Sequence, residues 1–539
     1  MRCREATRRK HFASALFAFA TLAAISPDGA LAHGFGQRYD LPVPLWLYLS
    51  GAAAAVGFSF LLLAIFARET GGHHGYPRIN LLRWRLARAF AHRYVLSCMR
   101  ALALALFVVV VAAGFAGAQN PFKNIAPITV WALWWVGVPY VSALLGNVWA
   151  LLNPVNTLFA YLEHGYARLT RGSALSLGLR YPAWLGIWPA VALFLAFAWA
   201  ELVWEHGDIP ANVATAILAY CAIAWTGMFL FGREIWLKRG ETFAIVFGLL
   251  SRFSPTEIRV LDPKVCEVCP VRNCRSASGC VDCYPCFRRA PGDACEWNLR
   301  PYAVGLLSDE PVHVSAMVLV ILMLATVTFD GFIETPLWAS IVERVTGWIG
   351  NGASPTLSDE ARGVLYTLVL VGFAAAFLAV YLGFCVAMAR LTARSEMATQ
   401  HGRAPYGAGT LARFFVLTLL PIAIAYHLAH YLSFLLMAGQ YLIPLSSDPF
   451  GFGWDLFGTS RYFVRIAIVD ARFVWYASVI AIVTGHIAAV YLAHVMAMKV
   501  FKDRRTAMLS QYPMLALMIG YTMLSLWIIA QPIVASRFG

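Results

Sequence analysis

The sequence predicts an all-α protein, a polytopic bundle of about ten transmembrane helices that carries a cysteine-rich loop. Three observations support this class: the low charge, a series of long apolar stretches, and basic residues confined to alternate loops. Hydrophobic residues make up 60% of the 539 residues and charged residues only 13%. A water-soluble domain usually carries about 25% charged residues. The composition therefore excludes a soluble enzyme and requires lipid around much of the surface.

The first 32 residues are expected to be a cleaved signal peptide. Five basic residues precede an apolar run at positions 12–25, and Ala30-Leu31-Ala32 provides a small-residue cleavage pattern. This apolar run is too short to cross a bilayer, which takes roughly 20 residues. We therefore expect the mature chain to begin at His33, outside the cytoplasm.

Ten further apolar stretches are expected to span the membrane, and none of them contains Lys or Arg. A cation at the centre of a spanning helix costs about 3 kcal/mol or more, which explains their absence. The stretches are 43–66, 101–118, 129–152, 182–204, 211–232, 312–332, 363–389, 414–440, 473–498 and 514–534.

The basic residues predict the orientation of these spans. Threading the chain from an outside His33 makes five loops cytoplasmic, and these hold 29 of the 42 Lys and Arg, against 8 outside. This bias is the positive-inside pattern, and it explains the net charge of +14 without nucleic acid as a partner. We expect a multi-pass protein of a bacterial inner membrane with a periplasmic mature N-terminus. The predicted divisions are 1–32, 33–232 (five helices), 233–311 (a cytoplasmic loop) and 312–539 (five helices).

Seven of the 11 cysteines fall within the loop at 233–311. Cytoplasmic thiols stay reduced, so clustered cysteines there favour a metal site over disulfides. The seven are Cys266, Cys269, Cys274, Cys280, Cys283, Cys286 and Cys295.

Two metal centres fit the cysteine spacing. The pairs Cys266/Cys269 and Cys283/Cys286 resemble the two chelating turns of a zinc ribbon. Alternatively, Cys280, Cys283 and Cys286 open an iron–sulfur pattern, in which Cys274 or Cys295 would have to provide the fourth ligand. Either metal could simply fold a polar insertion that has little hydrophobic core.

Four histidines lie inside the last apolar spans. His427 and His430 share a helical face, while His486 and His494 lie on the next, antiparallel span. His427 and His486 are about equally far from the middle of the connecting loop, which predicts similar depth. We expect His427, His430 and His486 to bind a divalent metal, most simply zinc with an open position, with His494 as a further ligand. Haem binding, proton relay or plain interhelical hydrogen bonds remain alternatives.

Acidic residues approach the histidines from the outer side. Glu201 and Glu205 end one span, and Asp330 and Glu334 end another, each pair spaced by four. Solvated acids at helix ends are common, but together with the histidines these acids predict a cavity open to the periplasm. Asp330 is the first candidate for a catalytic base, and Glu201 is the second.

Several segments resemble a family of polytopic bacterial membrane proteins, the fenitrothion hydrolases. The resemblance covers most of the chain. It rests on Ala32-His33-Gly34, Asp40-Leu41-Pro42-Val43-Pro44, Asn120-Pro121, the stretch 131–149, Asn153-Pro154, Thr328-Phe329-Asp330-Gly331-Phe332, Ala429-His430-Tyr431 and Gly439-Gln440. It implies hydrolysis of an organophosphorus triester to a nitrophenol and a dialkyl phosphate diester. It does not imply which residues act.

The leading hypothesis is therefore a metal-dependent hydrolase of an apolar substrate that reaches the site through membrane lipid. The metal would activate water and polarise the phosphorus centre. Two alternatives stay open: electron transfer from an iron–sulfur loop to haem or copper on the histidines, and transport of a metal ion or solute. The sequence does not decide whether a partner subunit is needed.

Overall fold

The computed structural model describes residues 44–66, 76–267, 269, 275–276, 279–349, 358–398, 406–465, 469–501 and 503–531. The predicted signal peptide, His33 and Cys274 lie outside these residues. The described part of the chain is mostly helical, and it contains ten helices long and apolar enough to cross a membrane. The prediction of an all-α, ten-span bundle is confirmed.

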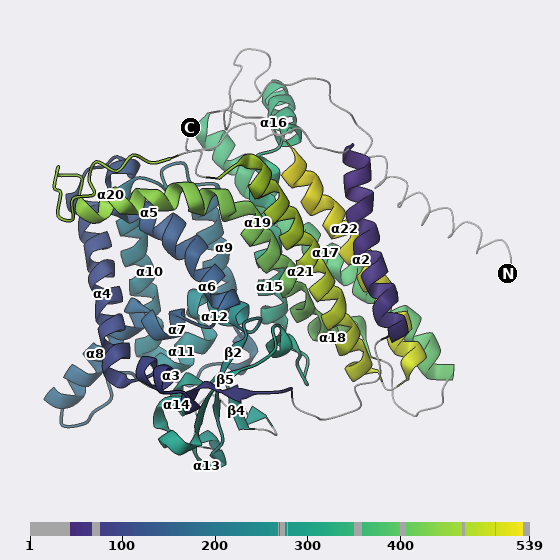
Figure 1. The fold of residues 1–539 in the computed structure, drawn as a ribbon, viewed down its shortest axis with the longest axis horizontal. Helices are drawn as coiled ribbons and strands as arrows, with labels where there is room; N and C mark the ends of the chain where they lie inside the picture. The colour runs from purple at the N-terminus through teal and green to yellow at the C-terminus, as the bar shows by residue number, and fades with distance from the viewer. Residues whose placement is uncertain are drawn as a thin grey trace.

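The ten spans match the apolar stretches of the sequence, most of them to within a few residues at each end, and Figure 1 shows them running between two ends of the molecule. They are α2 (Leu45–Phe66), α4 (Arg93–Ala116), α5 with η4 and α6 (Ile125–Leu144), η5 with α9 (Ala183–Leu202), α10 (Pro210–Phe231), α15 (Val314–Ile333), α17 (Asp359–Ala398), α18 to α20 (Ala408–Ser447), α21 (Ala471–Val500) and α22 (Arg504–Ala530).

Small residues allow the helices to approach closely. A Cβ atom on Gly114 of α4 would lie 2.6 Å from the Cβ of Ala214 in α10. In the same way, a Cβ atom on Gly485 of α21 would lie 2.4 Å from the Cβ of Ala425 in α19 (Leu420–Ala438). Helices surrounded by lipid have no hydrophobic driving force for association, so close packing of this kind stabilises the bundle instead.

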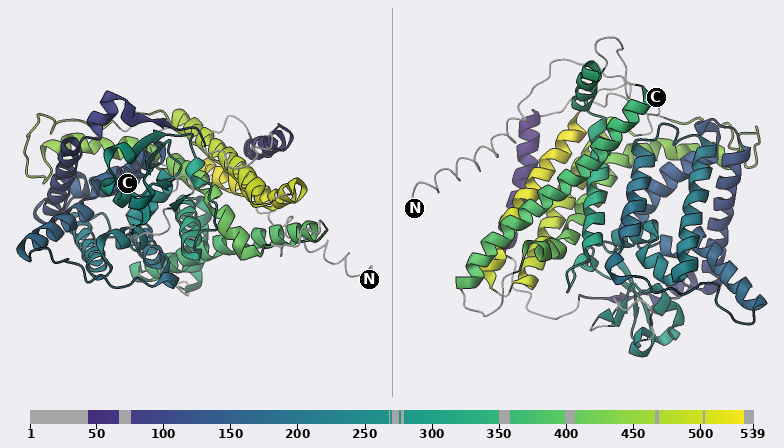
Figure 2. Two further views of the ribbon diagram at one scale, coloured as in Figure 1. Left: turned by 90° about the horizontal axis from the view of Figure 1, so that it is seen from below. Right: turned by 180° about the vertical axis from the view of Figure 1, so that it is seen from behind.

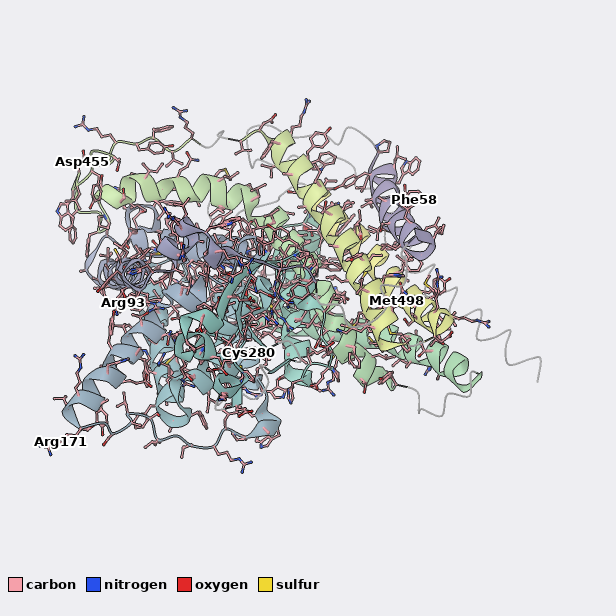
Figure 3. All side chains as sticks on the ribbon, turned by 60° about the horizontal axis from the view of Figure 1, so that its bottom comes forward. Phe58, Arg93, Arg171, Cys280, Asp455 and Met498 are labelled. Carbon is pink, nitrogen blue, oxygen red and sulfur yellow. The ribbon has the colours of Figure 1, made fainter. Side chains whose placement is uncertain are left out.

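Short helices and loops separate into two ends. In Figures 1 and 2, α5, α16 (Pro336–Ile349) and α20 (Leu442–Ser447) lie at the upper end, and α3 (Arg85–Phe90), α8 (Pro154–Leu169) and the strands lie at the lower end. The loops predicted to be cytoplasmic are therefore at one end. In Figure 3, which turns the lower end forward, Cys280 is labelled there.

A small antiparallel sheet joins two of the lower loops. Its strand order is β1-β5-β2-β4-β3. Leu299 of the second strand in this order pairs with Ile79 on one side and with Thr256 on the other. The strands are β1 (Ile79–Asn80), β2 (Thr256–Val260), β3 (Arg275–Ser276), β4 (Gly279–Val281) and β5 (Cys295–Leu299). The short helices α13 (Pro263–Glu267) and α14 (Tyr284–Arg289) complete this cysteine domain.

The sequence predicted that the whole segment 233–311 is a loop outside the bundle, but part of it lies within the bundle. Its first part forms α11 (Arg233–Arg239) and the apolar α12 (Thr242–Ser251), whose Phe243 and Phe247 are buried in the main hydrophobic core. Ten helical residues extend only about 15 Å, half the hydrocarbon thickness, so a search for spanning segments does not detect α12.

Candidate functional site

A network of polar side chains lies between four of the spans, toward their upper ends. His430 Nε2 is 2.9 Å from Asp330 Oδ2, and the Tyr431 hydroxyl is 2.5 Å from the same oxygen. That hydroxyl is also 3.0 Å from Glu201 Oε1, to which the Trp135 indole N–H donates at 2.5 Å. The structure therefore brings together Asp330, Glu201 and His430, which the sequence had indicated separately as candidate site residues.

The two carboxyl groups share the hydroxyl of Tyr431. Asp330 comes from the last turn of α15 and Glu201 from the last turn of α9, whereas Tyr431 lies within α19. One phenolic proton can be donated to only one carboxylate at a time. The pair thus forms a site at which a proton can be held or exchanged among three groups within hydrogen-bond reach.

A glycine lets α15 pass close to the histidine helix. A Cβ on Gly331 would lie 2.6 Å from the hydroxyl of Tyr426 and 3.5 Å from Nδ1 of His430. Any side chain at this position would push α19 away from α15. Gly331 therefore permits the short bond between His430 and Asp330.

The third span contains a π-helix, η4 (Thr129–Gly137), beside this network. π-Helical turns are rare and occur often at functional sites. The π-helix carries Trp135, which bonds Glu201 and whose ring centroid lies 5.8 Å from that of His427. The irregular turn thus supplies two contacts of the site.

The His427 imidazole packs against an aromatic cage. Its ring centroid lies 4.7 Å from that of Tyr431, 5.4 Å from Tyr140 and 5.8 Å from Trp135. Its Nε2 atom is buried and has no hydrogen-bond partner among the described residues. A neutral imidazole carries a lone pair on one of its two ring nitrogens, so Nε2 can accept a proton in the tautomer that has its hydrogen on Nδ1.

A small cavity adjoins His427. Its volume is about 40 Å³, and His427, Trp135, Tyr140, Glu201 and Tyr431 form part of its wall. The remaining wall is mostly apolar and comes from α6 (Val138–Leu144), α9, α12, α15 and α19. A water molecule needs at least about 10–15 Å³ measured in this way, so the cavity has room for roughly three.

The structure does not assemble the predicted histidine metal site. His486 Nδ1 lies 2.8 Å from the carbonyl of Ile482 in its own helix, and its ring packs against Tyr521 of α22. His494 Nδ1 lies 2.9 Å from Gln511 Oε1, also on α22. Within the described part of the chain, only cysteines form groups of three or more potential metal ligands.

The reason lies in which residue of α21 faces α19. Gly485 and Ser478 make the contact, and the Ser478 hydroxyl donates to the carbonyl of Ala429 at 3.0 Å. His486 follows Gly485 and is rotated by about 100° around the helix, which directs it toward α22. Equal distance from the connecting loop predicted depth but not direction.

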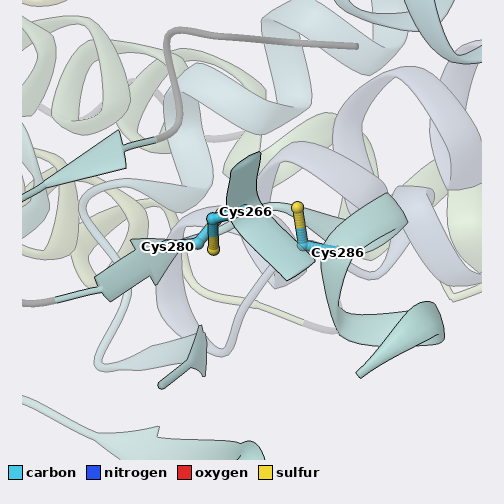
Figure 4. A group of neighbouring side chains, drawn as sticks. All are labelled: Cys266, Cys280 and Cys286. Atoms are coloured by element: carbon cyan, nitrogen blue, oxygen red, sulfur yellow. The ribbon is translucent and has the colours of Figure 1, made fainter. Parts of the chain in front are cut away.

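The cysteine domain does bring its thiols together. Cys266, Cys280 and Cys286 form one group (Figure 4), and Cys269, Cys283 and Cys286 form a second, with all sulfur atoms in a group within 4.8 Å of one another. All five side chains are buried. This cluster can bind a metal ion.

Cys295 belongs to neither cysteine group. Its thiol points toward the carbonyl oxygens of Phe287 and Ala290, at 3.5 and 3.9 Å.

Within the cluster, a hydrogen bond from Cys280 and the nearby ammonium of Lys238 lower the pKa of Cys283 and favour its thiolate. A thiolate is the form that binds metals.

Sequence reasoning missed three aromatic residues of the membrane site: Trp135, Tyr140 and Tyr431. Aromatic residues in membrane proteins mostly pack or anchor, and nothing in their spacing distinguishes these three. Only the position of Tyr431 directly after His430 offered a hint.

Comparison with family models, with curated proteins and with solved structures gives no match for this chain.

Proposed function

We propose that the chain is a membrane hydrolase of organophosphorus triesters of the fenitrothion type, with the buried network as its reaction centre. One observation carries the proposal: His427, whose Nε2 has no hydrogen-bond partner among the described residues, lines a cavity that also touches Glu201 and Tyr431. Ionisable residues within spanning helices are costly and usually functional. The resemblance of the sequence to the fenitrothion hydrolases supplies the substrate class.

The chemistry would use His427 as a general base. Water in the cavity gives a proton to Nε2 while its oxygen attacks phosphorus, and the bond from phosphorus to the aryl oxygen breaks. The products are a dialkyl phosphate diester and a nitrophenol, which receives its proton from the imidazolium or from the carboxyl pair. General base catalysis of this kind contributes about 10²- to 10⁴-fold.

Asp330 has a different role from the one first expected. Because it bonds both His430 and Tyr431, it orients the network rather than removing a proton from water itself. Glu201 is the carboxyl group that reaches the cavity wall and can hold the transferred proton. No metal is assigned to the histidines, because they do not share a coordination sphere.

The substrate must enlarge the cavity. Ligand cavities for molecules of this size usually measure about 300–1,000 Å³, far above the 40 Å³ available. The apolar wall and the surrounding lipid suit a substrate that partitions into the bilayer. We place the network toward the periplasmic side of a bacterial inner membrane, because the opposite end carries the basic loops.

Purified protein in liposomes tests this proposal. We expect fenitrothion to release its nitrophenol, and hydrolysis in H₂¹⁸O to place one ¹⁸O on the phosphorus product. Absence of turnover, or ¹⁸O appearing in the nitrophenol, would contradict attack by water at phosphorus.

The size of the cavity also favours a second candidate, proton-coupled transport. Besides His427, the Tyr426 hydroxyl and His486 Nε2 are buried without hydrogen-bond partners in the described part of the chain. Ionisable groups of this kind inside spanning helices are typical of proton relays. A pH gradient across liposomes that dissipates through the protein, with no triester turnover, would favour this candidate over hydrolysis.

The electron-transfer alternative would need a coloured centre. An iron–sulfur cluster or a haem absorbs visible light, so the spectrum of the purified protein tests it directly. A visible absorption band would favour electron transfer, and a colourless protein would contradict it.

A further inference from the structure

We propose that the cysteine cluster holds one zinc ion around Cys286 and that zinc occupancy stabilises α12, a wall of the membrane cavity. The proposal goes beyond hydrolysis and does not depend on which reaction the cavity performs. It joins two parts of the molecule that the sequence left unconnected.

The sulfur spacing fits a single zinc ion. Cys283 Sγ lies 3.7 Å from Cys269 Sγ and 3.4 Å from Cys286 Sγ. Four thiolates at about 2.3 Å from tetrahedral zinc lie about 3.8 Å from one another. Thiolates on different irons of an iron–sulfur cluster lie farther apart, since iron and sulfide atoms stand between them. The fourth zinc ligand comes from the group of Cys266 and Cys280, which shares Cys286.

The cluster is tied to the membrane bundle by charge. Lys238 of α11 donates from Nζ to Cys283 Sγ at 3.4 Å. Four thiolates around Zn²⁺ carry a net charge of −2, and a buried anion needs such a partner. Arg289 of α14 adds a second tie, since its guanidinium lies 2.9 Å from Glu234 of α11.

Helix α11 is rigidly connected to α12. Trp236 fills a notch in which a Cβ on Gly227 or Gly240 would lie within 2.5 Å of its ring. One turn later, Glu241 forms the N-cap of α12 and accepts a hydrogen bond from the backbone N–H of Ala244 at 2.5 Å. A shift of Lys238 therefore cannot be absorbed by a loose linker before it reaches α12.

Helix α12 forms part of the cavity wall. Val246 and Leu250 line the cavity, and the ring centroid of Phe243 lies 4.4 Å from that of Trp134. The next residue, Trp135, donates to Glu201. A contiguous series of side-chain and backbone contacts thus runs from the thiols to Glu201, and we infer that coupling between the two sites travels through it.

Metal analysis of the purified full chain tests the zinc site. We expect one zinc per chain, lost in Cys286→Ser and retained in Cys295→Ser, which removes a thiol outside both groups. A wild-type chain without bound zinc, or a folded Cys286→Ser chain that keeps it, would overturn the site.

Hydrogen exchange of the wild-type chain, before and after zinc is removed with a chelator, tests the coupling without any variant. Exchange of the α12 amides should quicken about tenfold, the scale of one charge-assisted hydrogen bond. The amides of α2, on the far side of the bundle, should not change. Unaltered exchange in α12 would refute the coupling.

Two lysine variants test the route. Lys238→Met should keep its zinc yet show faster exchange in α12. Lys264→Met removes an exposed lysine from α13 in the same domain and should match the wild type. Identical exchange in both variants would exclude Lys238 as the connection.

Discussion

At the scale of single residues, the site depends on aromatic side chains that orient ionisable ones. Tyr431 bonds two carboxyl groups, and Trp135 bonds one of them. The sequence predicted the acids and histidines, because charged groups inside apolar spans stand out. It could not predict their aromatic partners, since Trp and Tyr are frequent in every membrane protein.

The variant Tyr431→Phe tests the shared hydroxyl. It keeps the ring beside His427 but leaves Asp330 and Glu201 without their common partner. We expect triester turnover to fall and the free energy of unfolding to drop by about 1–3 kcal/mol, because each carboxyl group loses one buried hydrogen bond. Turnover and thermal unfolding in detergent measure both effects, and unchanged turnover would show that the hydroxyl takes no part in the reaction.

At the scale of elements, the direction of each helix face decided what the histidines contact. Apolar length predicted all ten spans, and spacing placed His427 and His430 correctly on α19. The structure does not bring His486 and His494 to the predicted histidine metal site, because both face α22. Helix rotation depends on small residues such as Gly485, whose role becomes visible only when the neighbouring helix is known.

A methyl group at Gly485 tests that packing. In Gly485→Ala, the new Cβ would lie 2.4 Å from the Cβ of Ala425 and 2.8 Å from the carbonyl oxygen of Pro421. We expect a loss of about 1–3 kcal/mol from forced separation of α19 and α21. Gly372→Ala, where nothing lies within 4 Å, provides the matched control. Equal melting temperatures of the two variants would contradict the packing.

At the scale of the whole molecule, two lower loops fold together into one domain. Tyr76 and Arg78 come from the first loop, and both bond the buried Glu257, each at 2.5 Å. Arg300, which directly follows β5, lies 2.9 Å from the same carboxylate. Charge bias predicted that these loops share a side of the membrane, but nothing in the sequence predicted that they pair.

This charged cluster predicts how the domain responds to acid. Burial disfavours the Glu257 carboxylate, but bonds from Tyr76 and Arg78, together with Arg300, outweigh it and lower its pKa. The stabilisation is therefore present above the unfolded pKa of about 4.3 and is lost as pH falls through the lower folded value.

Calorimetry between pH 3 and 7 should show this acid response. In Glu257→Gln the domain should be less stable near pH 7, and its remaining stability should depend less on pH. An acid response identical to that of the wild type would assign it to other groups.

The account rests most heavily on His427 as the base that activates water. The most direct measurement is nitrophenol release by His427→Gln in liposomes, compared with His494→Gln, which alters a histidine bonded to Gln511 away from the cavity. With both variants folded, we predict at least a 100-fold loss for His427→Gln, the lower bound for a general base, and near wild-type turnover for His494→Gln. Wild-type turnover in His427→Gln would contradict the account.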